Sequence, residues 1–336
     1  MTPGTPREII EGIHELGSLP QSLSAVLKVV NNPHAGAKEI AEVISRDISL
    51  TTRLLKMVNS SHYMRKGRVT KVSEAVIVMG LESIKTLILG STIFGMTPDE
   101  ELLKMMDIRR IWRHLLEVAQ NARIIAELIG YREPEEAFVT GILHDVGIVI
   151  LLLHFKKDYA ELVAKARRNR QELVVVEQDT LGYNHAEIGA ELITAWRLPK
   201  SLAYAVRNHH NSEDTSTNPT EEKLCDIVSL ADRLAVGSLE IFQTDIARLA
   251  REIKSMARNL KLDHTETGKI RRDSLSRSLE MAAYLELDVG DVIEIISDAN
   301  AYLADLYFGL EQTYLEMQGY YENTEVSRAS EKTVTG

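Results

Sequence analysis

The sequence predicts an all-α protein. Apolar residues recur at spacings of three and four through most of the chain, whereas the alternation that marks a β-strand is almost absent. Hydrophobic residues make up 44% of the 336 residues and charged residues 26%, which is ordinary for a globular protein. Only 5% are aromatic, so we expect a core of leucine, isoleucine, valine and alanine.

Composition also limits the classes of partner and compartment. The formal net charge of -10 argues against a general nucleic-acid binder, because such proteins present a basic face. The single cysteine, Cys225, excludes an internal disulfide and suits a reducing compartment. The chain opens with a polar segment, and its longest apolar run, residues 147–153, is too short to span a bilayer. We therefore expect a cytoplasmic protein without membrane contact.

Residues 1–96 are expected to form an N-terminal helical lobe. Turn residues divide this region into short helices, and Asp47 is placed to cap one of them. Gly80 separates two apolar helical runs, residues 72–79 and 81–94. The other helices are expected over residues 7–16, 20–30, 38–45 and 48–58.

Residues 97–240 are expected to form a second helical lobe. A long helix runs from Asp99 or Asp107 to Ile129, and Gly130 fits the position after its end. Asn184 is placed to cap a helix that ends at Trp196. Further helices are expected from residue 133 through His144, over 155–169, from 199 to the 209–211 corner and over 224–236, with a polar loop at 212–220.

The last third differs in character. Amphipathic helices are expected over residues 241–260, 274–285 and 289–317, within a C-terminal helical region that we bound at 241–320. Residues 321–336 are polar and expected to be disordered. The pattern leaves open whether this region is a separate domain or folds back onto the core.

The stretch from Gly141 to Ile148 places His144 and Asp145 side by side in an apolar helical run. Adjacent helical positions point about 100° apart, so the side chains of His144 and Asp145 converge on one point only if a bound group lies between them and the neighbouring helices. In proteins, that bound group is usually a metal ion. Seven candidate ligands share positions on or at the ends of helices beside apolar residues, and all offer nitrogen or oxygen: His114, His144, Asp145, His185, His209, His210 and Asp232.

Seven ligands are more than one tetrahedral zinc uses, and they suit two octahedral ions that share a carboxylate. Iron or manganese is favoured, with zinc, magnesium or nickel as alternatives. In one division, His114, His144, Asp145 and Asp232 hold the first ion, and Asp145 bridges to a second ion held by His185, His209 and His210. Two ions about 3.5–4 Å apart activate a water molecule and clamp a phosphate, which implies phosphate-ester hydrolysis with Asp145 as the catalytic residue.

Each residue also has a simpler interpretation. A lone histidine on a helix is most often a packing or surface residue. The simpler role of His209 and His210 is to interact with the dipole at a helix C-terminus, and the simpler role of Asp232 is to pair with Arg233. The joint pattern of all seven residues is what favours a metal site.

Several further segments act as sequence motifs: Leu19-Pro20, residues 48–63, residues 75–81 with Met79-Gly80-Leu81, Trp112-Arg113-His114, residues 138–147, residues 185–199, His209-His210 and Ala231-Asp232. Together they resemble the motifs of the HDOD family, the output-domain branch of the HD superfamily of metal-dependent phosphohydrolases. The resemblance covers roughly residues 8–240. It implies an all-α fold and a regulatory or signalling role in bacteria.

The seven candidate ligands also resemble the two-metal ligands of the HD-GYP phosphodiesterases of cyclic di-GMP. This chain departs from them at Ile148, where those enzymes carry a phosphate-handling lysine, and at residues 211–214, where the Gly-Tyr-Pro signature is missing. Arg207 and Arg233 are candidates to replace the missing cation.

Three functions therefore remain open. The first is a signalling protein with one or two metal ions, which acts through a protein partner or a homodimer formed by the C-terminal helices. The second is an active phosphohydrolase on a phosphorylated small molecule, nucleotide or cyclic dinucleotide. The third is a helical scaffold whose histidines are vestigial.

Overall fold

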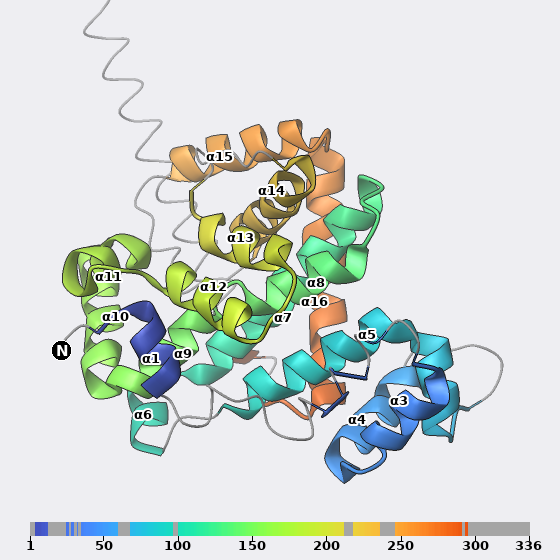
Figure 1. Cartoon of the computed structure of the whole chain (residues 1–336). Coiled ribbons are helices and arrows are strands. Elements are labelled where there is room, and N and C mark those ends of the chain that lie inside the picture. The colour runs from blue at the N-terminus through green and yellow to red at the C-terminus, as the bar shows by residue number, and fades with distance from the viewer. Residues whose placement is uncertain are drawn as a thin grey trace, which may run out of the picture.

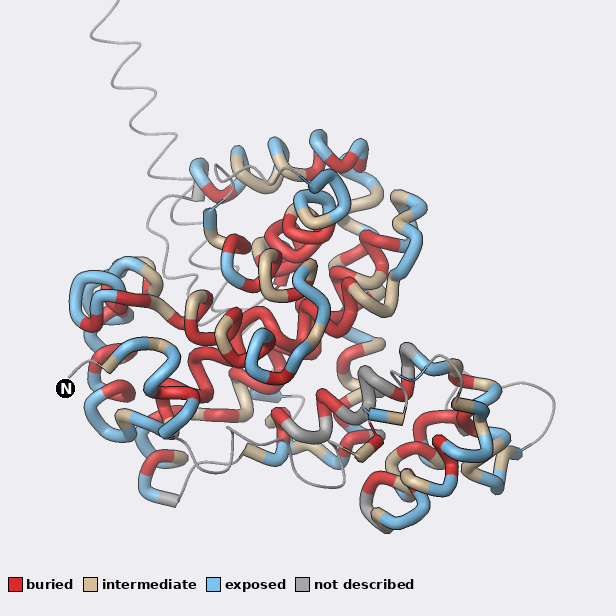
Figure 2. The backbone as a smooth tube through the Cα atoms, viewed as in Figure 1, coloured by how far each residue is buried: buried red, intermediate tan, exposed pale blue. Residues whose placement is uncertain are grey.

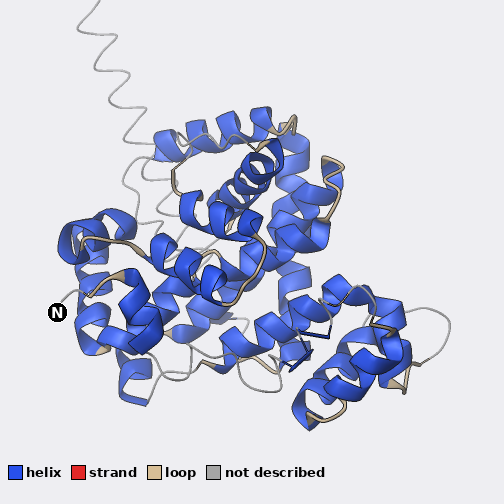
Figure 3. Ribbon diagram, in the orientation of Figure 1, coloured by secondary structure: helices blue, strands red, loops and turns tan. Residues whose placement is uncertain are grey.

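A computed structural model of the chain consists of helices joined by turns and loops (Figure 3). It describes residues 4–12, 25–26, 28–29, 32, 35–59, 68–96, 100–211, 218–235, 246–290 and 293–294. All regular structure within these ranges is helical, so the predicted all-α fold class is confirmed.

Three N-terminal helices form a group at one end of the molecule (Figure 1). Here α3 (Ala37–Ile44) and α4 (Ile48–Val58) pack against α5 (Val72–Gly95), whereas α1 (Pro6–Gly12) packs against a helix of the second lobe. Asp47 caps α4 as expected, since its Oδ1 accepts a hydrogen bond from the Leu50 amide at 2.9 Å. Gly80 interrupts α5 with a φ of 77°, which is the expected break. Most of the helix expected over residues 20–30 lies outside the described residues.

The centre of the fold is α7 (Ile108–Leu128), of whose 21 residues 16 are buried (Figure 2). Asp107 caps this helix, and Gly130 follows its end with a φ of 66°. The preceding residues form a separate short helix, α6 (Glu100–Met105), so the long helix begins at the later of the two expected positions. Two core helices, α8 (Pro134–Leu143) and α9 (Val146–Phe155), follow α7.

One stretch, Pro134–Phe155, is long and apolar enough to cross a membrane by length and composition alone. Of its most apolar window, 83% is buried inside the fold. Its hydrophobicity is therefore accounted for by packing against the surrounding helices, chiefly α7 and α12.

The rest of the second lobe surrounds these core helices. It comprises α10 (Lys157–Asn169), α11 (Leu173–Leu181), α12 (His185–Ala195), α13 (Lys200–Asn208) and α14 (Pro219–Leu234). The sequence pattern did not predict α11. Asn184 caps α12 as expected, and α14 begins five residues before the expected start because Asn218 caps it there.

The C-terminal helices α15 (Ile246–Asn259) and α16 (His264–Leu285) pack against α14 and α7 respectively. Helix α16 lies against α7, and the Arg271 Nε atom donates a hydrogen bond to the Leu234 carbonyl at 3.2 Å. It begins ten residues earlier than expected because Asp263 and Glu266 form a capping box. The helix expected over 289–317 and the tail at 321–336 fall almost wholly outside the described residues.

Candidate metal centre

His144 and Asp145 lie in a turn between two helices. Helix α8 ends at Leu143 and α9 begins at Val146, so the expected single helix through His144 is wrong. Asp145 leaves helical geometry, with φ -106° and ψ 16°. This break, rather than the 100° spacing of a continuous helix, lets the two side chains converge, with His144 Nε2 and Asp145 Oδ2 3.2 Å apart.

The first group of ligand candidates joins helices α7 and α14 to this turn. The Nε2 atom of His114 lies 3.2 Å from His144 Nε2, 3.4 Å from Asp145 Oδ2 and 3.2 Å from Asp232 Oδ1. All four residues are at most 2% exposed. Four side chains from three separate segments therefore meet at one buried point.

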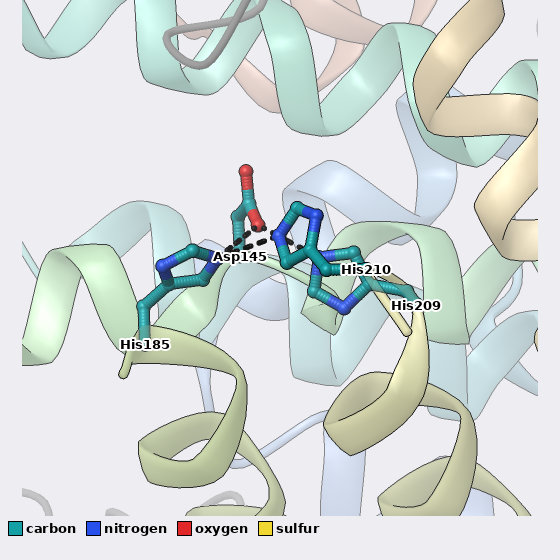
Figure 4. Close-up of side chains that lie close together, drawn as sticks. All are labelled: Asp145, His185, His209 and His210. Atoms are coloured by element: carbon teal, nitrogen blue, oxygen red, sulfur yellow. Dashed lines mark hydrogen bonds and ion pairs between the residues drawn. The ribbon is translucent and has the colours of Figure 1, made fainter. Parts of the chain in front are cut away.

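The second group shares Asp145. Its other carboxylate oxygen, Oδ1, lies 3.4 Å from His185 Nε2 and 3.3 Å from His209 Nε2. His210 completes the group, with its Nε2 atom 2.9 Å from His185 Nε2. Figure 4 shows His185 on one side and His209 and His210 on the other, with Asp145 between them. Six of the seven predicted residues thus form two clusters whose donor atoms could each hold a cation, and the seventh, Asp232, lies beside the first cluster at 3.2 Å from His114 Nε2.

Hydrogen bonds from the far side of three rings turn their Nε2 atoms toward the centre. The Nδ1 atoms of His144 and His209 each lie 2.7 Å from a main-chain carbonyl, of Gly141 and Val206 respectively. The Nδ1 atom of His185 lies 2.6 Å from the Glu177 carboxylate. A proton on Nδ1 leaves the Nε2 lone pair available for a metal, as is usual for histidine ligands.

Glu177 is a functional residue that the sequence analysis missed. Its side chain is fully buried on α11, and it also accepts hydrogen bonds from the His185 amide at 2.9 Å and from the Tyr159 hydroxyl. A buried carboxylate with three donors is well compensated and holds the ring of His185 in place. The sequence signal was an acid that directly follows the apolar run at residues 173–176.

Two buried atoms test whether the residues present fit a metal ion. Asp145 Oδ1 and His209 Nε2 have no hydrogen-bond partner although they lie 3.3 Å apart. Each such atom costs roughly 1–3 kcal/mol when left unsatisfied. A cation between them would satisfy both, and the donor set of imidazole nitrogens and carboxylates suits a divalent transition metal. The buried histidine and aspartate side chains therefore fit a divalent metal ion.

The electrostatics agree with this fit for Asp145, His209 and His210. Burial opposes charge on Asp145, but the neighbouring histidines, His144 first, hold its pKa well below the usual range. Burial lowers the pKa of His209, and it lowers that of His210 well below the ordinary value with help from the adjacent histidines. The carboxylate is therefore ionised and these two imidazoles are neutral, which is the state that binds metals.

His114 is the exception. Burial alone would lower its pKa, but the carboxylates of Asp145 and Asp232 outweigh burial and raise the pKa to about 10. In the metal-free protein this ring carries a proton at neutral pH. A metal ion must displace that proton when it binds.

The two arginines expected to supply a cation near the cluster, Arg207 and Arg233, are both paired with carboxylates. Ile148 is fully buried in the core. Arg207 pairs with Glu191 at 3.3 Å, and Arg233 pairs with Asp232 at 3.1 Å and with Glu252 at 3.5 Å. Both candidate arginines are thus engaged by carboxylates of the protein.

Two glycines set the spacing of the helices that carry the ligands. A Cβ atom at Gly141 would lie 2.6 Å from the Cα atom of Ala119 on α7, and one at Gly147 would overlap the carbonyl group of His185 on α12. Helices α8 and α9 therefore approach α7 and α12 more closely than any other residue would allow.

The fold and site define a class of protein, a helical domain with a buried His/Asp cluster of metal-ligand character. The HDOD domain family matches residues 16–212, which is more than half of the chain, and the protein belongs to this family.

Similar solved structures support the same fold. A protein from Shewanella amazonensis SB2B that carries the provisional name phosphohydrolase is 26% identical, with a TM-score of 0.63 over 82% of this chain and 97% of that one. An HDOD domain protein of unknown function from Geobacter sulfurreducens is 24% identical, with a TM-score of 0.65 over 85% and 97% of the two chains.

An uncharacterised protein of Treponema pallidum is 29% identical over 214 residues, which is 60% of this chain and 39% of the relative. The chain therefore spans less than half the length of this curated relative.

Proposed function

We propose that this HDOD protein binds two divalent metal ions, with iron or manganese favoured, and acts as a regulatory protein in the bacterial cytoplasm. The observation that carries the proposal is the pair of clusters that share one carboxylate, Asp145, with Asp232 beside the first of them. His114, His144, Asp145 and Asp232 would hold one ion. Asp145, His185, His209 and His210 would hold the other.

Three features favour regulation over hydrolysis. Six of the seven ligands are at most 2% exposed, so solvent reaches little of the described part of the site. Ile148 supplies no charge where a phosphate contact is expected. The nearby Arg233 is held by Asp232 and Glu252. In a regulatory protein, the ions would lock four helices and one turn in a single arrangement, and a partner or a second copy would bind through the C-terminal helices.

Metal analysis of the purified protein tests the site. We expect about two ions per chain in the wild type and about one in His114→Ala or His210→Ala, each of which loses a ligand from one cluster. Asp145→Asn should fall below about 0.2 ions per chain, because both clusters lose their shared ligand. His154→Ala is the matched control, since this histidine lies outside the cluster and should leave metal content unchanged. Fewer than about 0.2 ions per chain in the wild type would overturn the proposal.

A metal-dependent phosphohydrolase is the second candidate, favoured by the completeness of the ligand set and the name of the similar Shewanella protein. Bound ions would supply a Lewis acid for phosphate oxygens. A panel of phosphomonoesters, nucleotides and cyclic dinucleotides, tested with Mn²⁺ and Fe²⁺, separates the two functions. Turnover that is lost in a folded Asp145→Asn variant would establish the enzyme. A fully loaded protein without turnover on the whole panel would favour regulation.

A further inference from the structure

A cavity is lined by residues from the end of α14, from α15 and from the first turns of α16. Figure 1 shows where these three helices lie. Its volume is about 850 Å³, within the range of roughly 300–1,000 Å³ that small-molecule sites occupy. None of the seven metal-ligand candidates lines it. It is therefore a separate feature of the fold.

The floor of this cavity is apolar. Leu234 of α14, Leu249 and Ala257 of α15, and Leu262 of the following turn all line it and are otherwise buried in the protein. Such a surface favours the apolar or aromatic body of a ligand, because binding removes both surfaces from water.

The rim of the cavity is basic, in contrast to the net charge of -10 for the whole chain. Lys254 and Arg258 lie one turn apart on α15, and Lys261 follows the end of that helix. All three are exposed, and none forms an ion pair with any residue in the described ranges. Arg271 from α16 lies across from them, and its Nε atom is hydrogen-bonded to the Leu234 carbonyl.

The described lining also contains one acid, Asp263. Its Oδ1 accepts a hydrogen bond from the Glu266 amide at 2.8 Å and so caps α16. Among the described residues that line the cavity, the four lysine and arginine side chains therefore outnumber the one carboxylate. Lys254 and Arg258, one helical turn apart on α15, repel each other, and a bound anion relieves that repulsion.

We propose that this cavity binds a small organic anion, with its phosphate, sulfonate or carboxylate group at the rim cations and its aromatic body on the apolar floor. The charge and the surface of the cavity together select this class, since a neutral apolar ligand would leave the cations unpaired and a simple inorganic anion would leave the floor exposed to water. This site goes beyond the proposed function and does not depend on metal binding.

Two fluorescent probes with the same aromatic body separate the contributions. 1-Anilinonaphthalene-8-sulfonate carries an anionic group, and N-phenyl-1-naphthylamine lacks it. We expect saturable binding of one sulfonate probe per chain, with the sulfonate probe binding more tightly than the neutral one. The difference between the probes should shrink as salt is added, because salt screens the rim charges.

Variants then locate the probe. The double variant Lys254→Glu/Arg258→Glu should lower the affinity for the sulfonate probe about tenfold or more and change the affinity for the neutral probe less than about twofold. Lys223→Glu/Lys269→Glu is the matched control, with the same change of net charge at exposed positions outside the cavity, and should leave both affinities within about twofold. Gly268→Phe should weaken both probes, since a Cβ at Gly268 meets only the end of a flexible arginine and a ring there can fill the cavity.

Several results would overturn the proposal. These are absence of saturable binding in the wild type, equal loss in the two charge-reversal variants, and unchanged affinity for both probes in Gly268→Phe. Thermal melting of each variant verifies that the fold is intact. Because the probes are measured on metal-free and metal-loaded protein alike, failure here leaves the metal proposal standing, and failure of metal binding leaves this one standing.

Discussion

Replacing Glu177 by glutamine tests whether the second cluster holds a metal ion. Glutamine keeps the shape of the side chain and can still accept from the two donors of His185, but it removes the charge. The bond between Glu177 and His185 Nδ1, at 2.6 Å, is charge-assisted and about twice as strong as a neutral one. Losing that charge weakens the bond by about 1.5 kcal/mol, or roughly tenfold, and any rotation of the ring adds to the loss.

We therefore expect Glu177→Gln to lower the binding affinity of one of the two ions about 10- to 100-fold and to change the affinity of the other less than about threefold. Competition with a chromophoric chelator measures both affinities, and the visible spectrum of the Co²⁺-loaded protein reports the altered ligand field. Tyr159→Phe is the matched control. It removes a different bond to the same carboxylate, so it should cost about 1 kcal/mol of folding stability and leave metal affinity within about threefold. Wild-type affinity for both ions in a folded Glu177→Gln variant would refute the assignment of His185 as an oriented ligand.

Three further predictions concern stability. Gly147→Ala should destabilise the fold by about 3 kcal/mol or more in urea unfolding, because its Cβ would overlap the carbonyl group of His185; a stable variant with unchanged metal content would contradict the close approach. In metal-free protein, the pKa of His114 is raised to about 10, so its stabilising contribution is complete below the unfolded-state value of about 6.5 and is lost as the pH rises through about 10. Between about pH 6.5 and 10, the urea midpoint of the wild type should therefore fall by more than that of His114→Gln. An equal fall in the two proteins would count against the raised pKa of His114. Asp47→Ala should cost about 1 kcal/mol of stability by removing the cap on Leu50, and no change in the urea midpoint would argue that the cap is redundant.

Local signals in the sequence predicted much of the fold. Asp47, Asn184 and Gly130 mark helix ends where the structure has them, because caps and left-handed residues act through neighbouring backbone groups. The first ten residues of α16 escaped notice because they are mostly polar and carry no apolar stripe. The capping box of Asp263 and Glu266 was a readable signal for that start.

The candidate site was predicted as a set of residues, not as a geometry. Helical spacing identified inward-facing residues such as His114 and Asp232, and the structure brings them within 3.2 Å of each other. Their role as ligands stays a prediction. The turn at His144 and Asp145 could not be read from an apolar run, because nothing local breaks the helix there. The contact between Glu177 and His185 could not be predicted either, since it depends on the packing of α11 against α12 and not on sequence spacing.

The close approaches at Gly141 and Gly147 have a consequence for how this centre can change. They involve main-chain atoms of Ala119 and His185, so the distances between the ligand-bearing helices do not depend on which side chains point inward. Exchanging one imidazole for a carboxylate should therefore retune the preference for hard or soft cations without moving the scaffold. The two glycines would therefore keep the distances between these helices constant while the side chains that bind the cation are exchanged.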